Sequence, residues 1–405
     1  MNILYNIAIL CYGRFIALAT LFNAKARLLR NGQADSFAVL NTEINKNGEY
    51  TWFHSASLGE FEQGRPVIEA LKRNKPEIKI LLTFFSPSGY EIRKRYDKAD
   101  VVVYLPLDTK KNARKFLQTV PLKQAVFIKY EFWPNYLQAL FRSNIPVYSI
   151  SAIFRPRQLF FKPYGKWYLN LLSGFTRIFV QDTPSFELLQ QHRIKQVTVA
   201  GDTRFDRVLE IRQQAKKLPV IEAFRAGKKM IVAGSVWPQD EKLLVQYADE
   251  HPDVKMVIVP HEIHRSHLDG LSALLKNNFI TYSTATPEQA CLSGRLVVDA
   301  VGFLSSIYQY ADVAYIGGGF GVGIHNTLEA AVYGIPVVFG RNFQKFREAR
   351  ELIEIGGAFS ITDYESLKTC FDLLLTDAGK AGTIAGEYVK NNAGATGKII
   401  KELTQ

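Results

Sequence analysis

The segment of the sequence best suited to chemistry is glycine-rich and runs from Gly317 to Glu329. It follows the apolar run Val313–Ile316 and opens a predicted helix. Glycines let backbone amides approach a phosphate closely, and the amino end of a helix adds partial positive charge. Glu329, about one turn into the predicted helix, could accept hydrogen bonds from ribose hydroxyls. The segment favours nucleotide binding, although a flexible turn with His325-Asn326 as a helix cap fits the same residues.

Two other predicted strand ends in the second half of the chain carry polar residues. Ser235 ends one apolar strand and could either donate to a phosphate or cap the following helix. His261 and His264 follow the strand Lys255–Val259, but they are three positions apart, whereas the histidines of a zinc-binding HExxH motif are four positions apart. We therefore expect no metal there, and a phosphate contact through His261 or Arg265 is the better hypothesis.

Carboxylates follow two strands of the first half. Glu60 comes shortly after the first strand and could act as a general base. The pattern Ser57-x-x-Glu60 also fits a capping box, in which the carboxylate satisfies helix amides, and so does the pattern Ser88-x-x-Glu91. Glu131 lies in the loop after another strand. These loops are predicted to form one rim of a cleft.

The elements that must position these residues are short apolar strands alternating with helices, a pattern typical of parallel sheets covered on both faces. The predicted strands are Tyr50–His54, Ile80–Thr83, Val101–Tyr104, Ala125–Ile128, Val147–Ile150, Ile178–Gln181, Val197–Ala200, Met230–Ala233, Lys255–Val259, Leu296–Val298, Val313–Ile316 and Val337–Phe339. The predicted helices between the strands of the first half are Gln63–Asn74, Gly89–Tyr96, Thr109–Thr119, Asn135–Arg142 and Ser185–His192. We place a hinge near Gly201–Asp206. Two doubly wound α/β halves, with ligands at the carboxyl ends of their strands, are the predicted architecture.

The amino-terminal run Ile3–Phe22 is almost uniformly apolar and is interrupted by Arg14. Twenty helical residues would just span a bilayer core, and a charge at mid-run costs about 2.5–3.5 kcal/mol on insertion scales. Lys25, Arg27 and Arg30 follow, which would keep the rest of the chain in the cytoplasm. We expect a short membrane anchor or an interfacial helix, with a core helix as the alternative.

Composition limits the partners. The chain has 405 residues, a formal net charge of +12 and three widely spaced cysteines, so a disulfide framework or thiolate zinc site is excluded and an anionic partner is indicated. Basic and aromatic residues alternate over Phe154–Trp167. This segment could hold lipid phosphates at a membrane, stack nucleic acid, or form an amphipathic helix packed on the sheet. Because the apolar run Ile3–Phe22 lies in the same half of the chain, we favour membrane binding over nucleic-acid binding for this segment.

Six short motifs, in the same order along the chain, resemble those of the Kdo transferases, which attach 3-deoxy-D-manno-octulosonic acid (Kdo) to the lipid A precursor. The motifs are Ser57-Leu58-Gly59-Glu60, Ser86-Pro87-Ser88-Gly89, Glu131-Phe132-Trp133-Pro134-Asn135, Gly201-Asp202-Thr203-Arg204-Phe205-Asp206, Ala233-Gly234-Ser235 and His325-Asn326-Thr327-Leu328-Glu329. The resemblance covers nearly the whole chain. One departure is that Lys129-Tyr130 stand where Glu-Thr is usual in the family.

The resemblance implies a GT-B fold of two Rossmann-like domains facing a cleft, with a membrane-associated helix at the amino terminus. It implies a metal-independent enzyme without a cofactor that moves Kdo from CMP-Kdo to the lipid A precursor with inversion. The anionic surface of the inner membrane, on its cytoplasmic side, is the other expected partner, and nucleic acid is not. Residues 1–30 would form the membrane anchor or interfacial helix, 31–203 the acceptor domain and 204–405 the donor domain. A return of the last helix to the first domain is the alternative. The alternative function is a UDP-sugar transferase or nucleotide-sugar epimerase with the same fold.

Site residues follow from the matched motifs and strand ends. Glu60 is implied as the catalytic base. The expected acceptor residues are Ser57, Gly59, Ser86, Ser88, Gly89, Glu131 and Arg155. The expected donor residues are Arg204, Ser235, His261, Arg265, Gly318, Gly319, His325, Asn326 and Glu329.

Overall fold

The computed structural model describes residues 2–404, which fall into two compact units. The first unit contains the chain up to Arg207 together with the segment from Ala393 onward, and the second runs from Val208 to Asn392. The chain therefore passes from one unit to the other twice. The predicted boundary between residues 203 and 204 lies slightly before the observed boundary after Arg207. The difference arises because the start of helix α9 (Thr203–Gln213) is hydrogen-bonded to the first unit.

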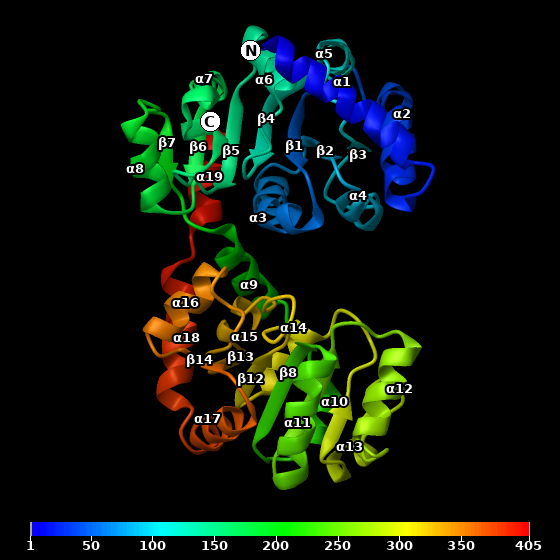
Figure 1. The fold of residues 1–405 in the computed structure, drawn as a ribbon, viewed down its shortest axis with the longest axis vertical. Helices are drawn as coiled ribbons and strands as arrows, with labels where there is room; N and C mark the ends of the chain where they lie inside the picture. Colours follow the sequence, from blue (N-terminus) through cyan, green and yellow to red (C-terminus); the bar gives the residue numbers. More distant parts are fainter. Residues whose placement is uncertain (1, 405) are drawn as a thin grey trace. The chain divides into compact units, whose positions relative to one another are not determined.

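The first unit is built on a seven-stranded parallel sheet with the order β3-β2-β1-β4-β5-β6-β7 (Figure 1). Its strands are β1 (Tyr50–Ser55), β2 (Lys79–Phe84), β3 (Val101–Tyr104), β4 (Leu122–Ile128), β5 (Val147–Ala152), β6 (Arg177–Val180) and β7 (Val197–Val199). The central strands β1, β4 and β5 are buried, and they carry apolar side chains on both faces, as expected when helices cover the two sides.

Helices cover both faces of this sheet. They are α1 (Asn2–Ala19), α2 (Ala24–Glu43), α3 (Leu58–Asn74), α4 (Pro87–Arg93), α5 (Lys110–Thr119), α6 (Pro134–Arg142), η1 (Leu159–Phe161), η2 (Pro163–Gly165), α7 (Lys166–Leu172), α8 (Thr183–Gln191) and α19 (Ala395–Leu403). One core, which contains Trp52 and Phe127, lies under α5 and α6. The other core, which contains Phe53 and Val126, lies under α3 and α19. Because side chains alternate along a strand, neighbouring residues of β1 and β4 belong to different cores.

The second unit has a seven-stranded parallel sheet with the order β10-β11-β9-β8-β12-β13-β14. Its strands are β8 (Met230–Val236), β9 (Lys255–Pro260), β10 (Ile280–Thr281), β11 (Arg295–Val297), β12 (Val313–Ile316), β13 (Val337–Gly340) and β14 (Ala358–Ile361). Its helices are α10 (Pro219–Arg225), α11 (Pro238–Glu250), α12 (Arg265–Leu274), α13 (Pro287–Leu292), α14 (Leu304–Ile307), η3 (Tyr308–Tyr310), α15 (Leu328–Ala331), α16 (Arg347–Glu354), α17 (Tyr364–Thr376) and α18 (Gly379–Asn391). Both units are doubly wound, so the predicted α/β class is confirmed.

All twelve predicted strands are present, and two edge strands were missed. β10 has two residues, which is too short to produce a pattern, and the middle of β14 is partly exposed and therefore less apolar. The helix predicted after the glycine-rich segment is much shorter than expected: α15 has four residues. A helix of one turn has only a small dipole, so α15 contributes less to anion binding than the sequence predicted.

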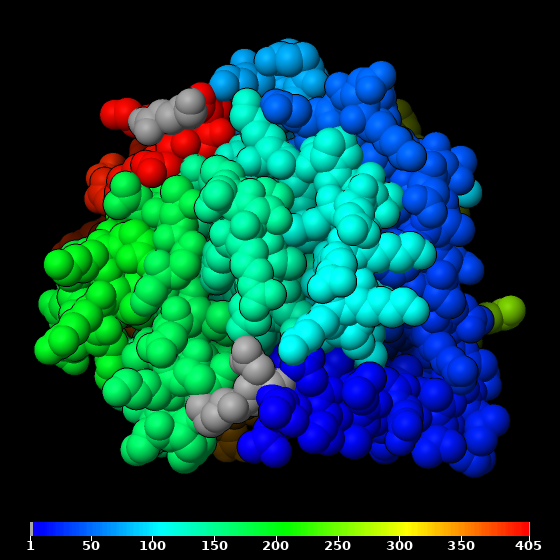
Figure 2. Space-filling view, turned by 90° about the horizontal axis from the view of Figure 1, so that it is seen from above, coloured from blue at the N-terminus to red at the C-terminus, as the bar shows by residue number. Residues whose placement is uncertain are grey.

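Helix α1 has one face against the first unit and one face exposed (Figure 2). Its Tyr5 hydroxyl donates to Asp108 at 2.6 Å, and Ile9 is buried. On the other face, large apolar side chains are exposed, among them Phe15 (68%) and Phe22, just beyond the helix (91%). Within residues 2–404, no helix is both long and apolar enough to cross a membrane.

Candidate functional site

Glu60 lies in the first turn of α3, directly after the carboxyl end of β1. Its Oε2 accepts a hydrogen bond of 2.9 Å from the Ala56 amide. Ser57 is the cap residue of α3, but its side chain makes no capping bond, so the predicted reciprocal capping box is not formed. The carboxylate therefore satisfies backbone amides at the start of the helix while it remains at the edge of the sheet.

The surroundings of Glu60 act on its pKa in opposite directions, and the net effect is to raise it. Burial, and then the charge of Glu131, raise the pKa of Glu60 above its usual range. Lys129 and the amides of Ala56 and Ser57 act in the opposite direction. A carboxylate whose pKa is raised toward neutrality is a better proton acceptor when ionised, as a general base requires.

Glu131 belongs to a network of hydrogen bonds that begins in the core. The Trp133 indole N–H lies 3.2 Å from Glu131 Oε2 and 2.9 Å from His54 Nε2. An indole nitrogen only donates, so His54 Nε2 accepts and the hydrogen of this buried ring is on Nδ1. His54 Nδ1 then donates to the Thr83 hydroxyl at 2.8 Å, which also accepts from Trp52 at 2.7 Å. This chain of bonds fixes the loop after β4 and with it the Glu131 carboxylate.

Lys129 also belongs to the site, because it acts on the pKa of Glu60. The sequence analysis had given it only as a departure from the family motif. It follows β4, with its amide bonded to Ile150 and its carbonyl to the Ser149 hydroxyl, and its φ is 62°. A non-glycine residue in the left-handed region is strained and is found mainly where a side chain must be placed. Burial lowers the pKa of Lys129, while Glu60 raises it. The sequence signal for this residue was that Lys129 stands where the family usually has glutamate.

The loop after β2 joins the same edge of the sheet. The Ser86 amide donates to the Ala56 carbonyl at 2.8 Å, and its hydroxyl lies 2.6 Å from that of Ser88. Ser86, not Ser88, is the cap residue of α4, so the predicted capping box at Ser88-x-x-Glu91 is wrong. Gly89 allows α4 to approach the start of α3, since a Cβ would come within 2.3 Å of the Phe84 ring.

The remaining expected acceptor residues are less closely placed. Gly59 is exposed in the first turn of α3 and meets nothing within 4 Å of where a Cβ would be. Arg155 is exposed after β5, and among the described contacts none joins its side chain to Glu60 or Glu131.

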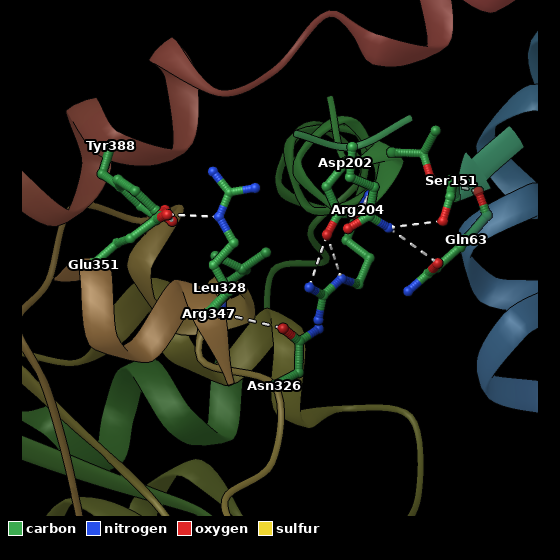
Figure 3. A network of polar contacts seen from close by, with 11 residues as sticks. Gln63, Ser151, Asp202, Arg204, Asn326, Leu328, Arg347, Glu351 and Tyr388 are labelled. Atoms are coloured by element: carbon green, nitrogen blue, oxygen red, sulfur yellow. Dashed lines mark hydrogen bonds and ion pairs between the residues drawn. The ribbon is translucent and has the colours of Figure 1, made fainter. Parts of the chain in front are cut away.

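Arg204 was expected on the donor side, but the structure places it in the first unit. Its guanidinium bonds Asp202 through Nε at 2.9 Å (Figure 3). The neighbouring Thr203 hydroxyl donates to the Gln63 carbonyl at 2.5 Å and lies 3.1 Å from the Ser151 hydroxyl. Arg204 and Asp202 both act on the pKa of Lys129, so this pair belongs to the electrostatic environment of the first-unit site.

In the second unit, Asp240 organises the glycine-rich loop. Its Oδ2 accepts from the Gly318 amide and from the Trp237 amide, both at 2.9 Å, and its Oδ1 accepts from the Tyr315 hydroxyl at 2.7 Å. Gly318 has φ +91°, which a side chain would strain. Its amide is used within the protein, so the expectation that it approaches a phosphate is corrected. Gly319 packs against Gly340, where a Cβ would lie 2.5 Å from the backbone.

Three rings stack at the carboxyl ends of β8, β9 and β12. His261 stacks on both Trp237 and His325, with centroid distances of 4.8 and 4.3 Å. The Trp237 indole donates to His325 Nε2 at 3.2 Å. Burial, and then His261, lower the pKa of His325 to about 4, so this ring is neutral near pH 7. His325 can therefore donate one hydrogen bond to a ligand but does not supply a positive charge.

The other expected donor residues differ in how they are placed and bonded. Ser235 is in β8 with φ 51° and is not a helix cap, since Trp237 is the cap residue of α11. Glu329 Oε1 accepts from the Asn326 amide at 3.0 Å, and Asn326 caps the Leu328 amide at 3.2 Å (Figure 3). Arg265 begins α12 and is exposed, and no described contact joins it to the stack.

Among residues 2–404, no group of three or more His, Cys, Asp or Glu side chains is arranged to hold a metal ion. What the two sites offer is a partly buried carboxylate in the first unit and, in the second, a glycine-rich loop with aromatic rings and a carboxylate. The first suits proton transfer, and the second suits a nucleotide.

Comparisons with known proteins agree with this chemistry. Residues 29–207 match the family described as 3-deoxy-D-manno-octulosonic-acid transferase (kdotransferase). A 3-deoxy-D-manno-octulosonic acid transferase of Aquifex aeolicus is 28% identical over 80% of this chain and 86% of the relative. A bifunctional glycosyltransferase/methyltransferase of Fusobacterium nucleatum is 25% identical over 88% of this chain, which spans only 57% of that relative's length.

Among solved structures, the UDP-GlcNAc 2-epimerase of Neisseria meningitidis bound to UDP-GlcNAc aligns with a TM-score of 0.59. The alignment covers 88% of this chain and 98% of the epimerase at 16% identity, so it shows a shared fold and nothing more. The family match and the relatives that align over most of the sequence are more specific. On these findings, residues 29–207 match the 3-deoxy-D-manno-octulosonic-acid transferase family, and the chain is similar to members of that family over most of its length.

Proposed function

We propose that this protein transfers Kdo from CMP-Kdo to a sugar hydroxyl of the lipid A precursor, with inversion and without a metal ion. The observation that carries the proposal is Glu60, a partly buried carboxylate held at the carboxyl edge of the first sheet by the Ala56 amide. The match of residues 29–207 to the Kdo transferase family, and the similarity to Kdo transferases over most of the chain, support the identity of the transferred sugar. A transfer assay with radiolabelled CMP-Kdo and lipid A precursor tests it, and absence of labelled lipid would refute it.

The reaction is a single displacement. The acceptor oxygen forms a bond to the anomeric carbon of Kdo as the bond from that carbon to the CMP phosphate oxygen breaks. Glu60 takes the proton of the attacking hydroxyl, and CMP departs with the electrons of the broken bond. Donors preorganised around the phosphate stabilise the departing charge. Ser235 and the neutral His325 are the side chains we assign to that role, and Glu329 is assigned to the ribose.

Replacement of Glu329 by alanine is expected to weaken CMP binding by about tenfold or more, because a buried ribose partner is worth about 1.5–3 kcal/mol when charged. The structural basis is the Asn326–Glu329 bond, which orients the carboxylate at the end of the glycine-rich loop. Isothermal titration of the full chain with CMP, in EDTA, measures the effect. We expect wild-type binding to persist in EDTA.

The matched control is Glu354→Ala, which removes an exposed carboxylate from α16 in the same unit. It should bind CMP as the wild type does. Equal affinity of Glu329→Ala and the wild type would refute the ribose assignment, and a requirement for magnesium in transfer would refute the metal-free mechanism.

We also propose that α1 lies on the anionic cytoplasmic face of the inner membrane. The support is its apolar face, which is exposed while the opposite face is bonded to Asp108 and packed on the unit. The triple change Phe15→Gln/Leu18→Gln/Phe22→Gln is expected to reduce binding to vesicles by about a hundredfold or more, since burial of each such side chain is worth roughly 1.5–3 kcal/mol. Vesicle co-sedimentation measures it.

These substitutions keep Tyr5 and Ile9, so they avoid the cost of uncovering the unit that a deletion of α1 would bring. Leu373→Gln, at an exposed apolar position of α17, is the control and should leave vesicle binding unchanged. A wild-type protein that ignores anionic vesicles would contradict the membrane proposal.

The competing function is a UDP-sugar transferase or epimerase, which the shared fold permits. Titration with UDP beside CMP separates the two. Tighter binding of UDP would favour the competing function, whereas selective binding of CMP favours Kdo transfer.

A further inference from the structure

We infer that the groove between α5 and α6 is a binding site for the phosphate headgroup of an anionic membrane lipid. The groove encloses about 430 Å³. Its lining residues are Lys110, Ala113, Arg114, Leu117, Gln118, Asn135, Gln138, Ala139, Arg142 and Ser143. It belongs to neither of the candidate sites described above. The inference rests on the proposed membrane association, but the experiments below distinguish a failure of this inference from a failure of the membrane proposal.

The groove exists because two helices present small residues to each other. On α5 the lining positions 110, 113, 114, 117 and 118 follow one helical face, and on α6 positions 135, 138, 139 and 142 do the same. Ala113 and Ala139 stand where the two faces meet. Their single methyl groups leave a channel, whereas the large side chains Phe116 and Leu140 point into the core.

The charge of the groove is entirely positive. Helices α5 and α6 contain five cationic and no acidic residues. Three of the cations, Lys110, Arg114 and Arg142, line the groove and are exposed. Within the part of the chain that the structure describes, none of the three makes an ion pair or side-chain hydrogen bond. Arginine guanidinium groups suit phosphate oxygens because they bind in a bidentate way.

The position of the groove identifies the source of the phosphate. Asn135, at one end, donates to the Asn6 side chain of α1 at 3.0 Å. In Figure 2, α5 (cyan) lies beside α1 (dark blue) and α6 (teal) on one face of the first unit. That face combines exposed apolar side chains on α1 with cations in the groove. A lipid supplies both complements, acyl chains and a phosphate, and free phosphate supplies only one.

The most direct test compares vesicle binding by two variants, each of which loses one positive charge, on opposite faces of the first sheet. Arg114→Gln should weaken binding to vesicles of phosphatidylcholine and phosphatidic acid in equal parts by about fivefold. Lys401→Gln removes an exposed charge from α19, on the other face of the same sheet, and should change binding by less than about twofold. Equal effects would mean diffuse attraction and would overturn the inference.

A second variant fills the groove without changing charge. Ala139→Leu places a larger side chain on the floor of the groove and should also weaken binding to these vesicles several-fold. Melting temperatures establish that each variant is folded. Binding of Ala139→Leu as tight as the wild type would overturn the inference.

Two further arms address other ligands. If inorganic phosphate raises the melting temperature of the wild type but not of Arg114→Gln, while vesicle binding is insensitive to Arg114, the groove binds soluble phosphate and the lipid assignment is wrong. Tighter binding of a single-stranded RNA through the same residues would also overturn it. Loss of vesicle binding in the α1 triple variant, with the groove variants unaffected, would leave the membrane proposal standing and remove this one.

Discussion

The Glu60→Gln protein is expected to lose about 10²–10⁴-fold in kcat, because the substitution removes the proton acceptor and preserves the size of the side chain. The amide oxygen of glutamine can still accept the bond from the Ala56 amide that the carboxylate accepts now. Folding and chemistry are thereby separated. CMP affinity should stay nearly unchanged, since the residues assigned to CMP belong to the second unit.

Stability provides an internal check on this variant. The pKa of Glu60 is raised in the folded protein, so the stability associated with this group is full below its unfolded pKa and is lost as the pH rises through its folded pKa. Near pH 7 the ionised carboxylate is therefore unfavourable to folding. Glu60→Gln is expected to melt at the same temperature as the wild type or slightly above it.

The matched control is Glu62→Gln, two residues along α3. Glu62 forms half-buried ion pairs with Arg93 and Arg65 at 2.6 and 3.5 Å, and no described contact joins it to Glu60 or Glu131. Its turnover should be near that of the wild type. Near-normal turnover of a folded Glu60→Gln protein would rule out Glu60 as the base and make Glu131 the next candidate.

Replacement of Lys129 by glutamate is the second change with a large expected effect. Glu60 can accept a proton only when it is ionised, and Lys129 is the side chain that most favours its ionised form. A glutamate there would add a like charge and raise the pKa of Glu60 further. The acidic limb of the kcat/KM profile should move to higher pH, with activity near pH 6 falling about tenfold relative to the plateau.

Two companion variants keep this prediction testable if the glutamate protein folds poorly. Lys129→Met removes the charge without adding another, and should shift the limb in the same direction by a smaller amount. Lys129→Arg keeps the charge and should leave the profile in place. A glutamate variant with an unchanged pH profile would show that Lys129 does not control Glu60, even though glutamate is the residue usual at this position in the family.

The sequence alone determined the class of fold and the order of its elements. Strands buried on both faces are usually almost continuously apolar, so β4, β9 and β12 were visible as short apolar runs. The edge strands β10 and β14 were not, because one is two residues long and the other is partly exposed. The family resemblance and the choice of Glu60 as the candidate base also came from local motifs, which need no knowledge of distant contacts.

The tertiary structure decided which groups act together. That His54, Thr83 and Trp133 form one chain of bonds to Glu131 depends on the pairing of β1 with β2 and β4, which brings residues far apart in sequence into contact. In the second unit, Asp240 accepts the hydrogen bond of the Gly318 amide, which the motif had predicted would bind a phosphate. Hydrogen bonds and charges act over a few ångströms of space, and a sequence records only distance along the chain. For that reason the motifs identified candidate residues, while their protonation, partners and availability to a ligand were fixed only by the fold.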